Sequence, residues 1–273
     1  MSVKYSFVTC KTALSTSKLP GLTYSLNPYI GCEHGCRYCY VPGVLNDRKL
    51  ALEWGQSVKA KKNIPEVLAQ EVKKKPKGVV GVSTVCDPYQ PIEARLELTR
   101  KCIDILARQD FPVSIQTKSE LVLRDIDLIV PGKFDVGVTI TTMNRKLARW
   151  LEPNAASPDK RAQVLEEFSA KGVETWLFLG PIIPEINDSE QSIREVIEVA
   201  ARTKSLVLYD KLNLRQWVME RLNDTMEKID PRPPDQEAKL IRKLSEIWHE
   251  TQTRIESTCK EKGVRCEPAF SKK

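Results

Sequence analysis

The stretch Tyr29–Tyr40 reads YIGCEHGCRYCY and spaces Cys32, Cys36 and Cys39 as C-x3-C-x2-C, with a glycine directly before each of the first two cysteines. Thiolates are the preferred ligands of iron–sulfur clusters, and this close spacing lets one loop wrap a cube of iron and sulfur. The glycines let the backbone approach such a group closely. Three protein ligands for four irons leave one iron open to a small molecule. The stretch therefore predicts a [4Fe–4S] cluster held by the three cysteines.

A zinc site and a chance grouping of core cysteines are the alternatives for this loop. The zinc site would take His34 as its fourth ligand, although His34 lies between Cys32 and Cys36 and is crowded for the usual paired-ligand geometry. The two glycines argue against three cysteines buried in the core by chance. A non-catalytic metal-binding protein is therefore one function that the sequence allows.

Outward from the loop, short β-branched runs alternate with helical patterns from about Tyr24 to Val207. Strands joined through helices pair in parallel, and six such units fall short of the eight in a full barrel. We predict an α/β fold, a partial (β/α)6 TIM-type barrel. The six expected strands are 22–26, 79–85, 113–117, 136–141, 175–179 and 206–208.

The helical patterns place apolar residues on one face between these strands. Asp188 is the expected N-cap of the helix that carries Ile193 and Ile197. A long apolar stripe over 240–255 has no strand after it, and prolines at 231–234 mark a break before it. We expect residues 1–225 to form the core, with a short lead-in over 1–20, and residues 226–273 to form a C-terminal helical extension packed on the barrel.

The bulk composition fits this architecture. The 273 residues are 41% hydrophobic and 29% charged, which suits one α/β barrel-like domain and argues against wholesale disorder. The net charge of +7 is a modest surplus that fits either a polyanion partner or a solvated basic surface.

The chain begins without the apolar core of a signal peptide, and no stretch approaches the ~18 apolar residues of a membrane span. We expect a cytoplasmic protein with no membrane partner. Eight cysteines in a reducing compartment are expected to be free thiols or metal ligands rather than a disulfide framework.

The pattern C-x3-C-x-(aromatic)-C, placed just after the first strand of a six-unit α/β chain, resembles the radical S-adenosylmethionine (SAM) superfamily. Five further motifs resemble its spore photoproduct lyase-related branch, and the resemblance covers about Leu26 to Leu214. It implies that SAM binds the open iron, that the cluster gives SAM one electron, and that a 5′-deoxyadenosyl radical then takes hydrogen from a substrate. The five motifs are 83–93, 116–119, 139–142, 151–155 and 180–188.

These polar motifs fall at the carboxyl ends of strands, where barrel enzymes place their sites. The resemblance implies that Lys118 pairs with the methionine carboxylate of SAM, that Thr139 contacts the ribose, and that Tyr38 lies against the adenine. Further candidates for contact with the cofactor are Asp87, Thr141, Glu152 and Ile183.

Purely structural roles for these residues stay open beside the functional ones. Lys118 could be a solvated lysine at a strand end, and Asp87 could simply start a turn. Glu152 could be a loop carboxylate that pairs with Arg161. Threonine at position 139 is also favoured by strands in general.

The resemblance also implies catalytic roles. Tyr38 and Tyr40 match the family tyrosines beside the cluster, and Cys86 lies near the position of a cysteine that returns hydrogen to the product radical. The residues around Cys86 differ from the family pattern, so a small buried residue at a strand end is the alternative.

The expected partners are SAM, an electron donor of flavodoxin or ferredoxin type, and DNA or RNA. Seven lysines between the first and second barrel strands favour a nucleic acid, although a charged outer helix face explains them as well. A peptide or small metabolite stays open as the substrate. The seven lysines are Lys59, Lys61, Lys62, Lys73, Lys74, Lys75 and Lys77.

Overall fold

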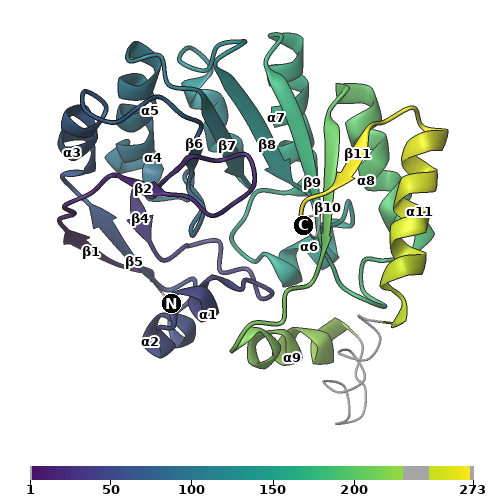
Figure 1. The fold of residues 1–273 in the computed structure, drawn as a ribbon. Helices are drawn as coiled ribbons and strands as arrows, with labels where there is room; N and C mark the ends of the chain where they lie inside the picture. The colour runs from purple at the N-terminus through teal and green to yellow at the C-terminus, as the bar shows by residue number, and fades with distance from the viewer. Residues whose placement is uncertain (1, 230–245, 271–273) are drawn as a thin grey trace.

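The computed structural model describes residues 2–229 and 246–270. An eight-stranded sheet runs in the order β11-β10-β9-β8-β7-β6-β3-β2, and its six central strands pair in parallel (Figure 1). The predicted partial (β/α)6 barrel is therefore confirmed. The six strands are β3 (Tyr24–Leu26), β6 (Val80–Val82), β7 (Val113–Thr117), β8 (Phe134–Thr139), β9 (Glu174–Ile182) and β10 (Leu206–Lys211).

Helices pack on the outside of this curved sheet (Figure 1). They form because apolar residues recur at helical spacing: Ile193, Val196 and Ile197 of α8 are all fully buried. The helices along the barrel are α3 (Ile64–Glu71), α4 (Glu93–Leu96), α5 (Leu98–Arg108), the 3-10 helix η1 (Glu120–Asp125), α6 (Arg145–Leu151), α7 (Pro158–Ala170) and α8 (Glu190–Thr203).

The N-cap of α8 differs from the prediction. Ser189 caps the helix by accepting a hydrogen bond from Ser192 N at 3.2 Å. The predicted cap, Asp188, instead accepts from Glu185 N at 2.8 Å, because its carboxylate closes the preceding turn. The expectation for Asp188 was wrong by one position.

A second, three-stranded sheet was not predicted. It contains β1 (Lys4–Val8), β5 (Ser57–Lys61) and β4 (Tyr29–Ile30), in the order β1-β5-β4. Lys59 and Lys61 were expected on a helix but lie on β5, where Val58 and Ala60 point inward and Lys59 outward. This alternation has the period of two that defines a half-buried strand. β2 (Leu14–Thr16), in the expected lead-in, adds an antiparallel edge to the large sheet.

Two short helices follow the cysteines, and two longer ones complete the described chain. These are α1 (Val41–Leu45), α2 (Arg48–Leu52), α9 (Val218–Ile229) and α11 (Trp248–Glu261). α11 packs along α8, and the expected stripe residues Leu240 and Leu244 lie outside the described residues. No strand was expected after this helix, but β11 (Cys266–Pro268) pairs in parallel with β10.

In the described part of the chain, no helix is both long enough and apolar enough to cross a bilayer.

Candidate active site at the cysteine loop

The cysteine loop (residues 31–40) connects β4 to α1 and is fastened to segments that follow the carboxyl ends of barrel strands. Arg37 N donates to Leu151 O at 2.8 Å, and Asn154 Nδ2 donates to Glu33 O at 2.8 Å. Leu151 and Asn154 both lie beyond the end of β8. The loop therefore sits at the end of the barrel where such folds place their chemistry.

A pair of buried polar side chains holds the loop from the β6 side. Glu33 N donates to Gln90 Oε1 at 2.9 Å, and Gln90 Nε2 donates to Gly31 O at 3.3 Å. Glu33 Oε1 in turn accepts from Ile92 N at 2.7 Å. Sequence reasoning missed this clasp, because nothing in the spacing of Glu33 and Gln90 shows that they meet.

Two glycines of the loop are required by close backbone approaches. Gly31 has φ +87°, and a Cβ there would lie 2.3 Å from Ser57 O. Gly35 has φ +59° and faces Gly55, where an added Cβ would lie 2.9 Å from Gly35 Cα. These positions favour glycine on both counts.

The three loop cysteines are free thiols that are almost removed from solvent. Cys32 and Cys36 are buried and Cys39 is partly buried. Burial raises the pKa of all three thiols, that of Cys36 to about 12. The thiols must lose their protons to bind metal, and the positive charge of metal ions would stabilise the resulting thiolates. This set of donors therefore suits a metal group whose binding releases protons.

The donors do not converge on a point. Among residues 2–229 and 246–270, no three His, Cys, Asp or Glu side chains are placed to hold a single metal ion. In an iron–sulfur cluster each cysteine binds a different iron, so the three thiols need not converge on a single point. His34, the proposed fourth ligand of the zinc alternative, lies with Nδ1 3.4 Å from Asp87 Oδ2.

A network of charged and polar groups, here called the site network, lies beside the loop. It contains Tyr38, Lys118, Glu152 and Arg161. The Tyr38 hydroxyl donates to Glu152 Oε1, and Glu152 Oε2 pairs with Arg161 Nη2 at 2.6 Å. Glu152 thus pairs with Arg161, as one of its two expected roles required, and it also binds Tyr38 of the cysteine loop, while its contact with the cofactor stays a prediction.

Lys118 stands out in this network. Its Nζ lies 5.9 Å from the centroid of the Tyr38 ring, and it makes no ion pair with a carboxylate of the described chain. Burial lowers the pKa of the ammonium, but Cys36, Glu152 and Asp87 nearby outweigh burial and raise it. A protonated, partly buried cation without an ionic partner is suited to an anionic ligand.

Asp87 positions the backbone beside this lysine. Its carboxylate accepts from Lys118 N at 2.7 Å and from Thr117 Oγ1 at 2.7 Å, and it is almost fully buried. Burial alone would raise its pKa, but His34, Lys118 and Thr117 lower it to about 2. Asp87 therefore joins the loop after β6 to the end of β7.

Thr139, Thr141 and Ile183 are all buried at the ends of β8 and β9. Thr139 Oγ1 accepts from Gln116 Nε2 at 3.2 Å, and Ile183 packs with Cys36 and Tyr38. Thr141 Oγ1 has no hydrogen-bond partner in the described chain, although it is buried. An unsatisfied buried hydroxyl costs about 1–3 kcal/mol, so a bound ligand would relieve it.

Cys86 lies on the other side of the loop. It packs with Cys32 and Trp54, its Sγ is 3.5 Å from Ser83 Oγ, and burial raises its pKa to about 12. The Trp54 Nε1–H is buried without a partner in the described residues. Tyr40 is partly buried, and burial raises its pKa as well. Unpaired donors next to the cysteines fit a group that brings acceptor atoms, as sulfide ions do.

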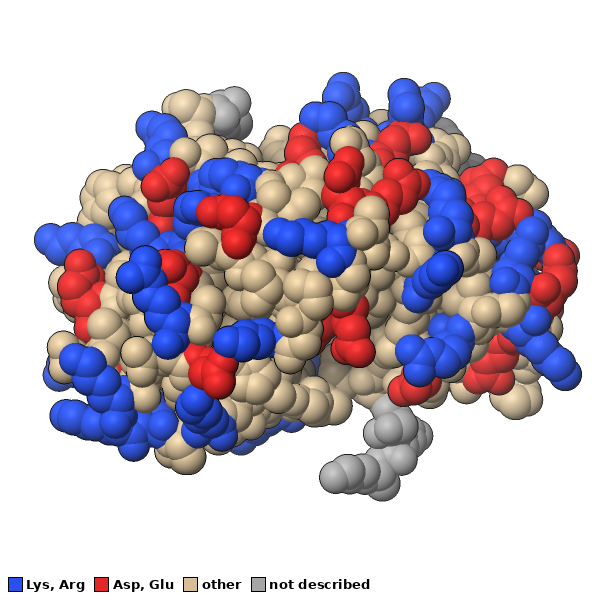
Figure 2. All heavy atoms as spheres, turned by 90° about the horizontal axis from the view of Figure 1, so that it is seen from above, with Lys and Arg blue, Asp and Glu red and all other residues tan. Residues whose placement is uncertain are grey.

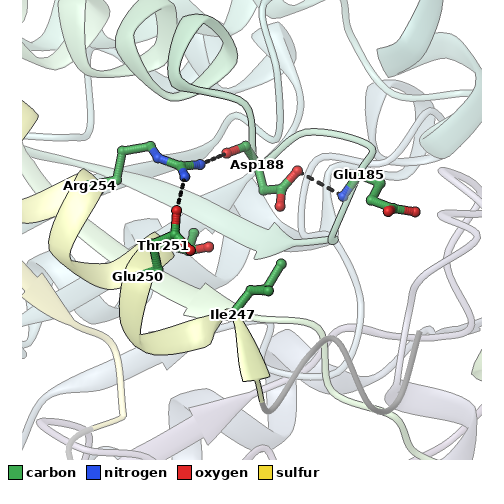
Figure 3. A pocket seen from close by; sticks show the side chains of 6 residues that line it. All are labelled: Glu185, Asp188, Ile247, Glu250, Thr251 and Arg254. Atoms are coloured by element: carbon green, nitrogen blue, oxygen red, sulfur yellow. Dashed lines mark hydrogen bonds and ion pairs between the residues drawn. The ribbon is translucent and has the colours of Figure 1, made fainter. Parts of the chain in front are cut away.

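Two further features lie away from the cysteine loop: the mixed charge of one face and a pocket beside α11. Figure 2 shows basic and acidic side chains interspersed over one face of the molecule rather than gathered into a basic field. A pocket of about 230 Å³ lies between the start of α11 and the loop after β9 (Figure 3). There Arg254 donates to Asp188 O at 2.7 Å, which fastens α11 to that loop, and also to Glu250 Oε1 of its own helix at 2.9 Å.

Comparisons with known proteins agree with this geometry. A model of the radical SAM superfamily matches residues 26–197. An uncharacterised protein of Methanocaldococcus jannaschii is 35% identical over 69% of this chain and 71% of its own length. An uncharacterised protein of Acidianus two-tailed virus is 28% identical over 83% of this chain and 80% of its own length.

Solved structures share the fold. A spore photoproduct lyase variant with bound AdoMet and dinucleoside spore photoproduct has a TM-score of 0.70 and 15% identity, covering 98% of this chain and 82% of its own. SuiB of Streptococcus suis bound to SAM has a TM-score of 0.51 and 13% identity, covering 76% of this chain and 48% of its own. Since the family model spans more than half of the chain, this protein belongs to the radical SAM superfamily, whose enzymes use SAM with an iron–sulfur cluster.

Proposed function

We propose that Cys32, Cys36 and Cys39 hold a [4Fe–4S] cluster at which SAM is reductively cleaved, and that the resulting radical takes hydrogen from a nucleic-acid base. One observation supports the cleavage of SAM at a cluster. Three free thiols lie in one loop, and Lys118, which makes no ion pair in the described chain, lies beside them. Thiolates supply the ligands of such clusters. A cation without an ionic partner supplies the site for the carboxylate of SAM.

Held by the thiolates of Cys32, Cys36 and Cys39, the cluster would supply the one electron that reductive cleavage of SAM to methionine and a 5′-deoxyadenosyl radical requires. The protein positions the reactants and excludes water. Lys118 holds the methionine carboxylate, and Asp87 fixes the backbone of Lys118 at the end of β7. Tyr38 and Ile183, which pack together near Cys36, flank the adenine.

The remaining strand-end residues hold the sugar. Thr139 and Thr141 lie on the segment that ends β8, and the unsatisfied Thr141 hydroxyl is available to a ribose oxygen. Glu152 keeps the Tyr38 ring in place through the tyrosine hydroxyl, and Arg161 balances the charge of Glu152. Arg161 thus neutralises Glu152, and Lys118 is left without a direct ion pair in the site network.

Cys86 is proposed to return a hydrogen atom to the product radical, with Tyr40 at the end of the cysteine loop as a second participant. A hydrogen-atom donor must keep its S–H bond, and burial raises the pKa of Cys86 to about 12, so the thiol stays protonated at neutral pH. We expect Cys86→Ala to leave SAM cleavage intact and to change the product. An unchanged product would remove this role.

Support for a nucleic-acid substrate comes chiefly from the fold, because on the face in Figure 2 the basic side chains are interspersed with acidic ones. The fold matches that of a lyase with a bound dinucleoside photoproduct over 98% of this chain, and the net charge is +7. A peptide or metabolite substrate would give no salt-dependent binding to DNA or RNA, whereas contacts with several phosphates give a steep slope against salt concentration.

The test of the substrate is transfer of deuterium into 5′-deoxyadenosine. Oligonucleotides deuterated at the base methyl or ring positions are incubated with anaerobically reconstituted protein, SAM and dithionite. Deuterium in 5′-deoxyadenosine from an oligonucleotide, and none with Cys36→Ala, is the expected result. Formation of 5′-deoxyadenosine without deuterium from any oligonucleotide would reject the nucleic-acid base and leave the cleavage of SAM standing.

A further inference from the structure

The segment α1–α2 has an inner face that touches the cysteine loop. Val41, Leu50 and Trp54 are buried and pack with Cys32, and Cys39 lies against the same group. The segment covers the two cysteines on that side, and a helix with its side chains is about 10–12 Å across. The outer face of α1–α2 is therefore close to whatever the cysteines hold.

The outer face of the same segment is apolar. Val44 is 47% exposed, Leu45 is 40% exposed and Leu52 is 69% exposed. Half of the six large hydrophobic side chains that are exposed in the described chain lie here, within nine residues. Such a concentration of exposed apolar groups marks an interaction surface.

Cations without ion-pair partners surround these apolar side chains. Arg48 and Lys49 are exposed on α2, and Arg215 lies beside α1, since a Cβ on Gly43 would be 2.9 Å from Arg215 Cβ. Within the described residues none of the three makes an ion pair. Two carboxylates belong to the same segment: the exposed Asp47, whose Oδ1 caps α2 by accepting from Leu50 N at 2.9 Å, and the partly buried Glu53 at the end of α2. The three exposed cations therefore outnumber the one exposed carboxylate.

We infer that the outer face of α1–α2 docks an acidic one-electron carrier protein of flavodoxin or ferredoxin type, a conclusion that rests on the proposed function. An apolar centre with a basic rim complements an acidic protein. The carrier loses one electron and the oxidised cluster gains it, so no further reductant is required. The approach through α1–α2 leaves the ends of β7 and β8, where SAM is proposed to bind, free for SAM and substrate.

The test compares two reductants on one set of variants. The variants are Leu52→Glu and the double variant Arg48→Glu/Lys49→Glu, and the matched control is Lys73→Glu/Lys74→Glu, at two exposed lysines after α3. With a purified flavodoxin kept reduced by its reductase, we expect formation of 5′-deoxyadenosine to fall about tenfold or more in both α2 variants, because steering by charge changes association rates by 10–10³. With dithionite, which needs no docking, the rate should stay at the wild-type value.

Binding gives a readout that is independent of catalysis. Anaerobic calorimetric titration of oxidised flavodoxin into the reconstituted protein without SAM should show salt-sensitive binding to the wild type and the control, and at least tenfold weaker binding to the α2 variants. Equal binding and equal flavodoxin-driven rates in all variants would overturn the docking surface. No product from the wild type with dithionite would instead reject the proposed function, so the two failures are distinguishable.

Discussion

Two buried charged networks lie near the carboxyl ends of the barrel strands, and they differ in how completely their atoms are paired. The second network contains Tyr29, Glu93, Arg124 and Asp125. Both oxygens of Glu93 have partners, among them the Tyr29 hydroxyl at 2.5 Å and Arg124 Nη2 at 2.9 Å. Both oxygens of Asp125 are likewise engaged, by Arg100, Arg124 and Tyr89.

The site network, in contrast, keeps an ammonium group without an ionic partner, and an unpaired buried hydroxyl lies nearby. Lys118 makes no ion pair in the described chain, and Thr141 Oγ1 accepts and donates no hydrogen bond there. Buried polar groups are normally satisfied, so each exception calls for an explanation. The saturated network needs only folding to explain it, whereas the unsaturated one fits the proposed binding of SAM.

The largest expected effect is at the cysteine loop. Cys36→Ala removes one of three thiolates, so the protein should lose most of its bound iron and the visible absorption of the cluster, because each cysteine binds its own iron. Iron and sulfide analysis after anaerobic reconstitution measures this. Cys10→Ala, at a partly buried cysteine of the lead-in, is the control and should keep wild-type iron content. Full iron content in Cys36→Ala would contradict the ligand assignment.

The second network should show its importance in stability and not in cofactor binding. Arg124→Met leaves the fully buried Glu93 and Asp125 without their shared cation, which should lower the free energy of unfolding by about 3–5 kcal/mol. Urea denaturation measures the loss. Arg108→Met, at an exposed pair with Asp104, should change little. If Arg124→Met kept normal stability but failed to bind SAM, the structural role given to the second network would be wrong.

Lys118→Met should affect the binding of SAM more than stability, the opposite of Arg124→Met. Loss of a charge-assisted bond of about 1.5–3 kcal/mol should weaken binding of SAM roughly 10- to 100-fold. The free energy of unfolding should fall by less than in Arg124→Met, because Lys118 makes no direct ion pair in the described chain and acts on Asp87 and Glu152 at longer range. Equilibrium dialysis with labelled SAM and urea denaturation separate the two effects. Lys160→Met, which removes a surface pair with Glu120, is the control. Unchanged affinity for SAM would show that Lys118 is an ordinary lysine at a strand end and does not bind SAM.

A smaller, pH-dependent effect is expected at Asp135, a partly buried carboxylate outside both networks. Its Oδ1 accepts from Ser114 Oγ at 2.6 Å and from Trp176 Nε1 at 2.7 Å, and burial raises its pKa. The favourable contribution of its protonated form is fully present below the unfolded-state pKa and is lost as the pH rises through the folded-state pKa.

Asp135→Asn keeps the acceptor oxygen and removes this titration. The variant should gain stability over the wild type at pH 7, by about 1.4 kcal/mol for each unit of pKa shift, and the gain should shrink as the pH falls toward 4. Urea denaturation at the two pH values measures the difference. A gain of equal size at both would show that the charge of Asp135 is not the cause.

The sequence predicted those features that are encoded in local patterns. Five of the six barrel strands follow from β-branched runs, the entry strand near 22–26 was expected as the sixth, and the spacing of Cys32, Cys36 and Cys39 led to the family. The position of Lys118 after an apolar strand was also readable, because parallel strands bring their ends together.

Features that depend on distant partners were missed. The clasp between Glu33 and Gln90 joins residues 57 positions apart, and its polar side chains look like ordinary loop residues in the sequence. β11 is three residues long and pairs only because α11 returns the chain to β10. Likewise, the local sequence does not show that Arg124 pairs with both carboxylates of the second network. Nor does it show that Arg161 takes Glu152 in the site network and leaves Lys118 without an ion pair.

The most direct measurement is the formation of 5′-deoxyadenosine by the reconstituted protein given SAM and dithionite without oxygen. The wild type should form 5′-deoxyadenosine and methionine in equal amounts, Lys118→Met should need a higher concentration of SAM, and Cys36→Ala should form none. Wild-type protein that carries a full complement of iron and sulfide, yet forms no 5′-deoxyadenosine, would contradict the assignment of the cysteine loop as the site of SAM cleavage.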